Sequence, residues 1–479
     1  MAVSTGQIVA ERDFYCGNGG TAQRWHVYIK AVPTSDWFRL TYSTANSKNL
    51  GADTTYPAID AIQRGKVYAG SHILGVAADA AATSGAWVDA TFTLYGFKCN
   101  GAPLNAYREY TKPASHTYCR VWFYHDNSSR STSVLLEARD SGGTVLSSRT
   151  FSTQIAGSAG VHAGAWFALP ASTSKIRITN QNAGEFDMAG LDWINTSSEV
   201  DPDTSGSMMF DLGYSDPSVT AFYDSTAAAE CFPVTIEQGS DELACYWASD
   251  GGAYSSSKAW GGLGHQGVNT VTKVFEYQTG TADWATWSPA VGAKQVCEAW
   301  RYRITAGNVY QTPYTTKLGD LAAVVTVDTC GIKNNLVCTT SAAVDLFELF
   351  ALTLFMPTDM THVLFGGDTQ ERNITAASAL YSTIKSQWVR VRGGANKTVY
   401  TVQNIAEGFA IGSASFYTVI DHISGQGKKL YIRAKADTST KLDLASGSFI
   451  RCNWALTLQD QRAAFINIPR AQSNPTIIR

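Results

Sequence analysis

Apolar and polar residues alternate along many short stretches of this chain. Residues 87–95 (WVDATFTLY) and 175–179 (KIRIT) have an apolar side chain at every second position, the pattern of a strand with one buried face. Residues 140–143 (DSGG) separate two further stretches, 133–139 and 144–151, and are typical of a tight hairpin turn. The pattern predicts an all-β protein with two or more β-sandwich or jelly-roll modules and few short helices.

Changes in composition divide the chain into four regions. Residues 195–206 are rich in turn-forming residues and have no apolar period, so we place a boundary there. It separates a jelly-roll sandwich at 86–197 from a larger β-sandwich domain at 207–456. We expect a β-rich attachment region at 1–85 and an extended C-terminal arm at 457–479.

Three segments depart from the strand pattern. Residues 342–354 are long enough for a helix, but their aliphatic and aromatic side chains also suit a buried strand, so both assignments stay open. Residues 376–385 favour a helix, and residues 58–63 favour a short helical turn.

Tryptophans mark candidate core positions. We expect Trp122, Trp166 and Trp193 to fill the core of the first sandwich. Trp284 and Trp287 are three residues apart, so on a strand they would point to opposite faces. One of them should then lie in the core and the other at the surface.

Charge and composition exclude several classes of protein. The chain has 479 residues with 37 basic and 40 acidic side chains, a net charge of −3, and only 16% of its residues are charged, against about 25% in typical proteins. This composition argues against a basic nucleic-acid-binding face.

The longest apolar stretch, 344–356, contains Asp345 and Glu348, so no membrane insertion is expected. The first residues (MAVSTG) lack the basic and apolar parts of a secretory signal, which predicts a protein made in the cytoplasm.

The chain contains nine cysteines, and an odd number leaves at least one unpaired. Buried free thiols are favoured, because disulfides usually accompany export. Cys330 and Cys338 are the exception that geometry allows, since they lie symmetrically about Asn334. If residues 333–335 form a hairpin loop, the two cysteines face each other and could form a disulfide.

Metal and nucleophile motifs are sparse. None of the eight His residues has an i+4 partner, and there is no Cys-x-x-Cys pair, so a zinc site is not expected. Asp187 and Asp192 lie near a predicted strand end and could bind Ca²⁺, although solvated turn carboxylates are the favoured interpretation. No other cofactor is predicted.

Catalytic signatures are also missing from the sequence. There is no Gly-x-Ser-x-Gly elbow and no Walker loop. Residues 262–267 match Gly-x-Gly-x-x-Gly by letter, but a predicted strand follows them instead of a helix. The basic run 390–397 could bind an anion weakly or form a strand with a solvated turn, the favoured reading. We therefore expect no enzyme, although an acidic pair on opposing strands, drawn from Glu237, Asp241, Asp250 and Glu298, cannot be recognised from sequence.

Aromatic residues within a Gly- and Ser-rich segment, residues 245–262, form the strongest candidate site. Exposed rings stack on the apolar faces of sugars, while nearby polar groups hydrogen-bond the hydroxyls. A subunit interface is equally compatible with the segment, because interfaces are also enriched in Tyr and Trp. The candidate carbohydrate-binding residues are Tyr246, Trp247, Asp250, Tyr254 and Trp260.

Residues 86–197 resemble the galactose-binding-like jelly rolls of carbohydrate-binding modules. The resemblance rests on residues 85–89 (GAWVD), 164–167 (GAWF) and 190–194 (GLDWI). The whole chain is similar in style to tail-fibre, receptor-binding and baseplate-type surface proteins of tailed bacteriophages, with its Ser/Thr/Gly/Ala-rich β modules.

The phage resemblance implies a structural virion component that assembles with other virion proteins and with itself, a trimer being favoured, and that binds host-surface polysaccharide during adsorption. Two alternatives stay open. One is a tail enzyme that degrades polysaccharide, and the other is a purely architectural collar or decoration protein.

Overall fold

The computed structural model describes the chain in segments. The described residues are 8–12, 24–30, 36–43, 58–73, 75–91, 98–125, 133–151, 160–163, 166–200, 208–211, 243–249, 260–263, 268–290, 292–311, 316–356, 360–375, 380–381, 384–393, 398–404, 416–423, 427–435 and 441–460.

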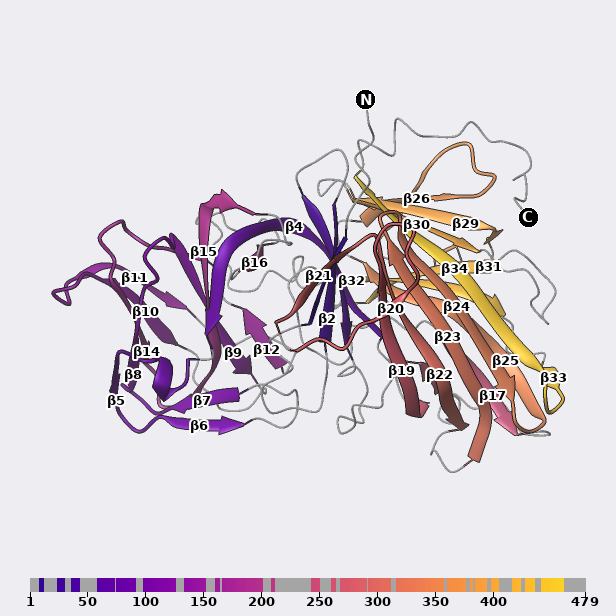
Figure 1. Cartoon of the computed structure of the whole chain (residues 1–479), viewed down its shortest axis with the longest axis horizontal. Coiled ribbons are helices and arrows are strands. Elements are labelled where there is room, and N and C mark those ends of the chain that lie inside the picture. The colour runs from indigo at the N-terminus through magenta and orange to yellow at the C-terminus, as the bar shows by residue number, and fades with distance from the viewer. Residues whose placement is uncertain are drawn as a thin grey trace.

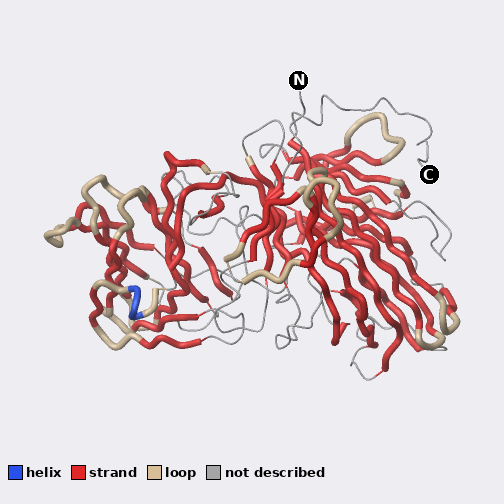
Figure 2. Tube along the Cα trace, in the orientation of Figure 1, coloured by secondary structure: helices blue, strands red, loops and turns tan. Residues whose placement is uncertain are grey.

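The protein is all-β across these residues, as the alternating pattern predicts. Every strand pair in the four sheets is antiparallel, and the one helical element among the described residues is the 3-10 turn η2 (Ala77–Asp79). A smaller sandwich lies at one end of the molecule and a larger body at the other (Figures 1 and 2).

The smaller sandwich contains a five-stranded sheet in the order β11-β10-β14-β8-β5. Alternate residues of β10 and β14 are buried, so one face of this sheet enters the core. That core also takes side chains from β9 and β15 of a second sheet. The strands of the five-stranded sheet are β5 (Ala82–Ser84), β8 (Tyr107–Thr111), β10 (Val134–Arg139), β11 (Val145–Phe151) and β14 (Lys175–Asn180).

The second sheet has twelve strands and extends from the sandwich into the larger body. Its main order is β12-β9-β15-β4-β3-β2-β1-β21. Figure 1 shows β4 as a long curved strand between the two parts of the molecule. The strands are β1 (Ile8–Arg12), β2 (Arg24–Lys30), β3 (Trp37–Ser43), β4 (Ala58–Ile73), β6 (Val88–Thr91), β7 (Lys98–Ala102), β9 (Tyr118–His125), β12 (Gly160–Ala163), β13 (Phe167–Ala168), β15 (Phe186–Glu199), β16 (Met208–Asp211) and β21 (Lys294–Cys297).

The larger body contains a seven-stranded and a ten-stranded sheet. The seven-stranded sheet has the order β18-β17-β25-β32-β31-β28, with β33 paired to β25. Its strands are β17 (Leu243–Ser249), β18 (Trp260–Leu263), β25 (Val344–Met356), β28 (Lys385–Ser386), β31 (Phe416–Ile423), β32 (Gly427–Lys435) and β33 (Leu442–Leu444).

The ten-stranded sheet has the order β20-β19-β22-β23-β24-β34-β30-β29-β26-β27. Its strands are β19 (Val268–Gln278), β20 (Ala285–Thr286), β22 (Ala299–Gln311), β23 (Thr316–Asp328), β24 (Gly331–Thr340), β26 (Met360–Phe365), β27 (Arg372–Asn373), β29 (Trp388–Gly393), β30 (Thr398–Asn404) and β34 (Phe449–Asp460).

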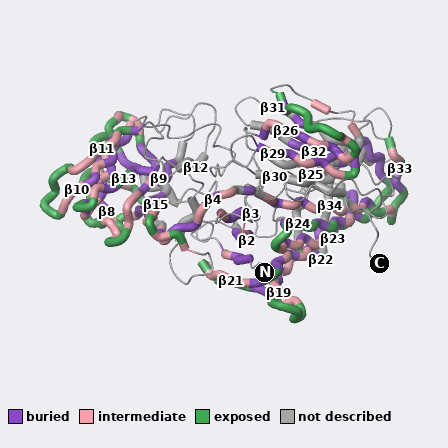
Figure 3. Tube along the Cα trace, turned by 90° about the horizontal axis from the view of Figure 1, so that it is seen from above, coloured by how far each residue is buried: buried purple, intermediate pink, exposed green. Residues whose placement is uncertain are grey.

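One hydrophobic core joins the two sheets of the larger body to the N-terminal strands. Trp25 and Tyr42, from β2 and β3, lie in the same buried cluster as Trp300 and Trp454 of the ten-stranded sheet and Leu346 of the seven-stranded sheet. The rings of Tyr42 and Trp300 lie 5.3 Å apart. Burial is concentrated along the strands, while the exposed residues gather at turns (Figure 3).

The sheets do not follow the expected boundaries between regions. Strands β1–β3 share the core of the larger body, so residues 1–85 do not stand apart from it. Strand β5 already belongs to the first sandwich, β16 pairs with β4, and residues 457–460 complete β34 instead of starting an arm. Composition marks turns, but it does not show which strands pair across long sequence separations. The division into independently folding domains stays a prediction.

None of the three ambiguous segments is helical at the residues that the structure describes. Residues 58–63 open β4, so the predicted helical turn is wrong, and residues 344–356 form β25. In the predicted helix at 376–385, Leu380 bridges Ile420 and Lys385 begins β28, so these described residues are not helical. Pairing with neighbouring strands overrides local propensity at these positions.

The tryptophan predictions are confirmed in part. Trp193 lies in the core of the first sandwich, whereas Trp166 is buried in a separate small cluster with Tyr68 and Ile194, and Trp122 is buried outside the sandwich core. Trp287 lies in the core of the larger body, whereas Trp284 is half-buried and contacts a guanidinium at the surface.

We predict that Gly331→Ala destabilises the larger body strongly. Gly331 opens β24 at a φ of +133°, and a Cβ there would lie 2.1 Å from the carbonyl oxygen of Leu456, so β34 would have to move. Gly447→Ala is the matched control, because Gly447 also has a positive φ (+84°) but has open space around a Cβ. We expect the control to cost about 1 kcal/mol and Gly331→Ala at least twice that, measured by urea unfolding. Equal costs would show that the close approach of β34 is not rigid.

Candidate functional site

The predicted aromatic segment lies at the end of the seven-stranded sheet. Tyr246 and Trp247 are on β17, and Trp260 is the first residue of β18, the terminal strand in the order of this sheet. The register places Tyr246 directly opposite Trp260 and places Trp247 opposite Leu346 of β25. The structure thus brings two of the predicted binding residues together across neighbouring strands.

The other two predicted binding residues, Asp250 and Tyr254, lie outside the described residues, so their role stays a prediction. Strand β18 also lies next to β19 and β22. The aromatic pair is therefore located where the seven-stranded sheet meets the ten-stranded sheet.

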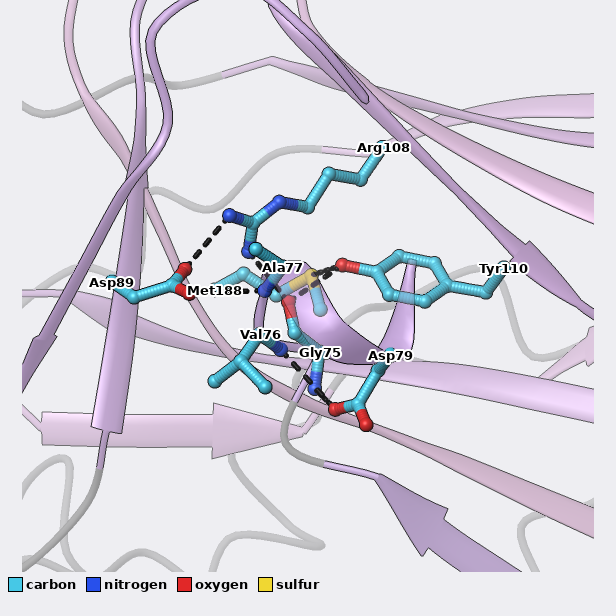
Figure 4. A network of polar contacts seen from close by, with 8 residues as sticks. All are labelled: Gly75, Val76, Ala77, Asp79, Asp89, Arg108, Tyr110 and Met188. Carbon is cyan, nitrogen blue, oxygen red and sulfur yellow. Dashed lines mark hydrogen bonds and ion pairs between the residues drawn. The ribbon is translucent and has the colours of Figure 1, made fainter. Parts of the chain in front are cut away.

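A buried arginine organises one end of the smaller sandwich (Figure 4). Arg108 on β8 is only 1% exposed, and it donates hydrogen bonds of 2.7 Å to the carbonyl oxygen of Gly75 and to Oδ1 of Asp89. Tyr110 donates its hydroxyl to the same carbonyl at 2.8 Å. Burial raises the pKa of Tyr110, so this hydroxyl stays protonated and remains a donor.

Two carboxylates of this network bind the backbone of residues 75–77. Asp79 accepts hydrogen bonds from the backbone N–H groups of Gly75 and Val76, and Asp89 accepts one from Ala77. Gly75 has a φ of +70°, a conformation that favours glycine, and a Cβ there would also push aside the terminal methyl of Met188. The network fixes the loop between β4 and β5, which leads into the smaller sandwich.

Sequence reasoning did not single out Arg108. It lies in an alternating strand (YREYT), where an arginine is normally solvated, and no motif marks it. The guanidinium also lies 4.5 Å from the ring of Trp87, which is the tryptophan in the GAWVD stretch. A structural role is therefore assigned to Arg108 and Trp87.

The predicted pair Asp187 and Asp192 forms no solvated turn. Both residues are on β15 and both are buried. Asp192 accepts hydrogen bonds from Nε of Arg120 at 2.8 Å and from Nε1 of Trp122 at 2.6 Å. This carboxylate is already neutralised, which leaves it a poor ligand for Ca²⁺. No group of three or more His, Cys, Asp or Glu that could hold a metal occurs among the described residues.

The outer face of the ten-stranded sheet, opposite its core, forms a broad polar surface. On β29, Val389 and Val391 are buried, so the alternate residues Trp388, Arg390 and Arg392 belong to the outer face. Across the sheet, one register row runs through seven strands. Its members are Glu276, Arg301, Thr326, Lys333, Ala455, Gln403 and Trp388.

Two arginines share one carboxylate at the β19 end of this row. Glu276 accepts hydrogen bonds from Nε of Arg301 at 2.7 Å and from Nε of Arg303 at 2.6 Å. The hydrogen bonds from Arg303 and Arg301 outweigh burial and lower the pKa of Glu276 to about 2. The guanidinium of Arg301 lies 3.9 Å from the ring centre of Trp284.

Arginines also neutralise carboxylates near the β29 end. Arg392 pairs with Glu371, and the hydrogen bonds from this arginine lower the pKa of the Glu371 carboxyl. Arg372 likewise lowers the pKa of Asp368, to which it donates hydrogen bonds from Nε and from a terminal nitrogen. Arg390 lies 5.8 Å from the ring of Trp388. Arg390 and Arg392 of the predicted basic run are thus strand residues, and 394–397 lie outside the described residues.

Four described carboxylates have a lowered pKa and therefore do not suit the role of a general acid. They are Glu276, Asp368, Glu371 and Asp443. A glycosidase acid needs a raised pKa, so that it carries a proton near neutral pH. Among the candidate catalytic carboxylates, Glu298 is exposed, and Glu237, Asp241 and Asp250 lie outside the described residues.

The predicted disulfide is wrong. Cys330 and Cys338 are both free thiols, because residues 331–340 form one continuous strand with no hairpin at 333–335. Extended residues rise about 3.3 Å each, so the two cysteines are about 25 Å apart. The turn comes earlier, at Thr329 and Cys330, between Asp328 and Gly331. Asn334, the expected centre of the loop, is buried within the strand.

Comparisons with known proteins identify no family. No family model matches the chain, and no curated protein matches it. Among the described residues, no helix is long and apolar enough to cross a membrane.

Solved structures give only weak likenesses. The GH36 alpha-galactosidase AgaA from Geobacillus stearothermophilus is 11% identical with a TM-score of 0.30, over 46% of this chain and 30% of that enzyme. An alpha-galactosidase from Lactobacillus brevis is 10% identical with a TM-score of 0.30, over 71% of this chain and 39% of the enzyme. The chain thus spans under half the length of these glycoside hydrolases. Scores this low do not establish a shared fold, and nothing about activity follows from them.

We predict that Cys330 and Cys338 react separately with a thiol reagent. Cys330 is exposed and should be alkylated in the native protein, whereas Cys338 is buried and burial raises its pKa to about 12. Mass spectrometry after brief iodoacetamide treatment, with and without denaturant, measures both sites. Resistance of both cysteines until a reductant is added would contradict the observed strand.

We predict that Glu276 contributes stability that is lost at acid pH. Its folded pKa lies below the unfolded value of 4.5, so the contribution is present above pH 4.5 and disappears as the pH falls toward 2. Glu276→Gln should flatten the fall of the urea midpoint between pH 5 and pH 2.5. The exposed Glu298→Gln is the control and should keep the wild-type slope. Identical slopes in all three proteins would rule out the shared ion pair as a stabilising contact.

Proposed function

We propose that this chain is a non-catalytic structural subunit of a tailed-bacteriophage virion that binds host-surface polysaccharide. The observation that carries the proposal is the register of β17 and β18, which sets Tyr246 opposite Trp260. Residues opposite each other in an antiparallel pair have Cβ atoms about 4.5–5.5 Å apart. An aromatic pair at that spacing is suited to stacking on neighbouring sugar rings.

The position of this pair supports a binding role. Strand β18 ends the seven-stranded sheet and lies next to β19 and β22 of the other large sheet. Contacts with two sheets restrain the backbone of such a site before binding, so the protein itself loses less entropy when a glycan binds. The Gly- and Ser-rich composition of residues 250–259 suits hydrogen bonding to hydroxyl groups.

The state of the carboxylates supports binding without bond cleavage. Glu276, Asp368 and Glu371 are each held ionised by arginines. An ionised carboxylate paired in this way accepts hydrogen bonds but does not deliver a proton to a leaving group.

We predict that Trp260→Ala and Tyr246→Ala each weaken binding to host-envelope polysaccharide at least tenfold, because each removes one stacking ring. Binding is measured with the purified, assembled protein, together with its thermal midpoint and its oligomeric state. Tyr107→Ala is the matched control, since it removes a half-buried aromatic ring from β8 of the other sandwich. The control should bind like the wild type.

Other outcomes separate the alternatives. A change in oligomeric state with glycan binding intact would assign the aromatic pair to a subunit interface and overturn the binding role. Release of oligosaccharides from the envelope preparation by the wild type would overturn the non-catalytic part of the proposal.

A further inference from the structure

We propose that the outer face of the ten-stranded sheet binds an acidic polysaccharide, as a second surface separate from the Tyr246–Trp260 pair. The inference rests on the arrangement of charge and aromatic rings across this sheet. It does not require the β17–β18 site to be correct.

The surface is long enough for a chain of sugars. The row from Glu276 on β19 to Trp388 on β29 crosses seven neighbouring strands. Strands lie about 4.8 Å apart, so the row spans about 29 Å. That distance suits an extended oligosaccharide better than a single sugar.

Positive charge predominates on this face although the whole chain has a net charge of −3. Glu276 is shared between Arg301 and Arg303, so one carboxylate faces two guanidinium groups. The basic residues at outer-face positions are Arg301, Arg303, Lys317, Lys333, Arg390, Arg392 and Arg451, and the acidic residues at such positions or paired with them from the turn before β27 are Glu276, Asp320, Asp328 and Glu371.

Two of the basic groups are accessible to a ligand. The side chain of Lys333, in the middle of the row, is 57% exposed. That of Arg303, near the β19 end, is 37% exposed. An arginine has five N–H donors. The contact of Arg303 with Glu276 uses only some of them, so the others can bind a ligand. A uronate carboxylate could therefore be bound beside Glu276 without displacing it.

Aromatic rings lie at both ends of the charged row. Trp284 stacks against Arg301 near the β19 end, and Trp388 lies beside Arg390 near the β29 end. Combined aromatic and arginine groups suit a sugar that has both an apolar face and a carboxylate.

The carboxylates on the same face favour a sugar chain over a nucleic acid. Asp328, Glu276 and Glu371 are interleaved with the basic groups and can accept hydrogen bonds from hydroxyl groups. Each residue of an acidic polysaccharide supplies hydroxyl donors beside its carboxylate, whereas a DNA residue within the chain supplies a phosphate and no free sugar hydroxyl. The mixture of donors and acceptors on this face therefore matches an acidic glycan.

Binding to polygalacturonate and to its fully methyl-esterified form tests the charge requirement, because the two polymers share one backbone. We expect the assembled protein to bind the acid at least tenfold more tightly than the ester, with an affinity that falls as salt rises. The double variant Lys333→Gln/Arg303→Gln should lose at least tenfold in affinity for the acid.

A charge-matched double variant controls for net charge. Lys175→Gln/Arg177→Gln removes a lysine and an arginine beside Glu109 on the smaller sandwich, and it should bind the acid within twofold of the wild type. Tyr246→Ala should also leave this binding unchanged, so failure of this surface and failure of the β17–β18 site are distinguishable.

Four outcomes would overturn the inference. They are no detectable binding to polygalacturonate, equal binding to acid and ester, equal losses in the two double variants, and tighter binding to a poly(dT) oligonucleotide than to polygalacturonate. The last outcome would assign the face to nucleic acid instead.

Discussion

The pairing of β1 with both β2 and β21 is the constraint on which the rest of this architecture depends. Backbone N–H and C=O groups must be paired when they are buried, and β1 finds one partner nearby and the other far along the chain. The first strands therefore enter the same core as the C-terminal sheets. The pairing of β1 with β21 leaves the smaller sandwich outside this core. The sandwich lies between β4 and β16 in the sequence and is attached to the larger body through β4.

The shared core also determines which face of the ten-stranded sheet is exposed to solvent. The N-terminal strands and the seven-stranded sheet contribute to the same core as the inner face of the ten-stranded sheet, so the opposite face of that sheet carries charged and polar residues. The ion pairs on that face, such as Glu276 with Arg301 and Arg303, are partly shielded from water. Partial shielding strengthens them relative to fully exposed pairs and keeps the side chains in fixed positions.

Arginine has two different roles in this molecule. In the smaller sandwich, Arg108 and Arg120 are largely buried and bind carbonyl or carboxylate oxygens, so they hold loops and strands in place. On the ten-stranded sheet, Arg303 is paired but accessible. The difference is one of burial, since a buried guanidinium uses its donors internally, while an accessible one can also meet a ligand.

The sequence by itself determined the strands, because a period of two in apolar residues is a local property. The hairpin at 140–143, the strand at 175–179 and the buried positions of Trp122, Trp166 and Trp193 could all be predicted from it. It also indicated the aromatic segment that contains Tyr246 and Trp260, as a matter of composition. It could not show that these two residues face each other, since register depends on which strands pair.

Only the tertiary structure decided the partners of each strand and the environment of each polar group. The polar run Lys333-Asn334-Asn335 looks like a turn, yet pairing with β23 and β34 keeps it extended and separates Cys330 from Cys338. The sequence suggests a solvated carboxylate at Asp192, yet on the adjacent strand Arg120 neutralises this group and Trp122 donates a hydrogen bond to it. In each case the deciding partner is distant in sequence, and contacts of that kind leave no local pattern.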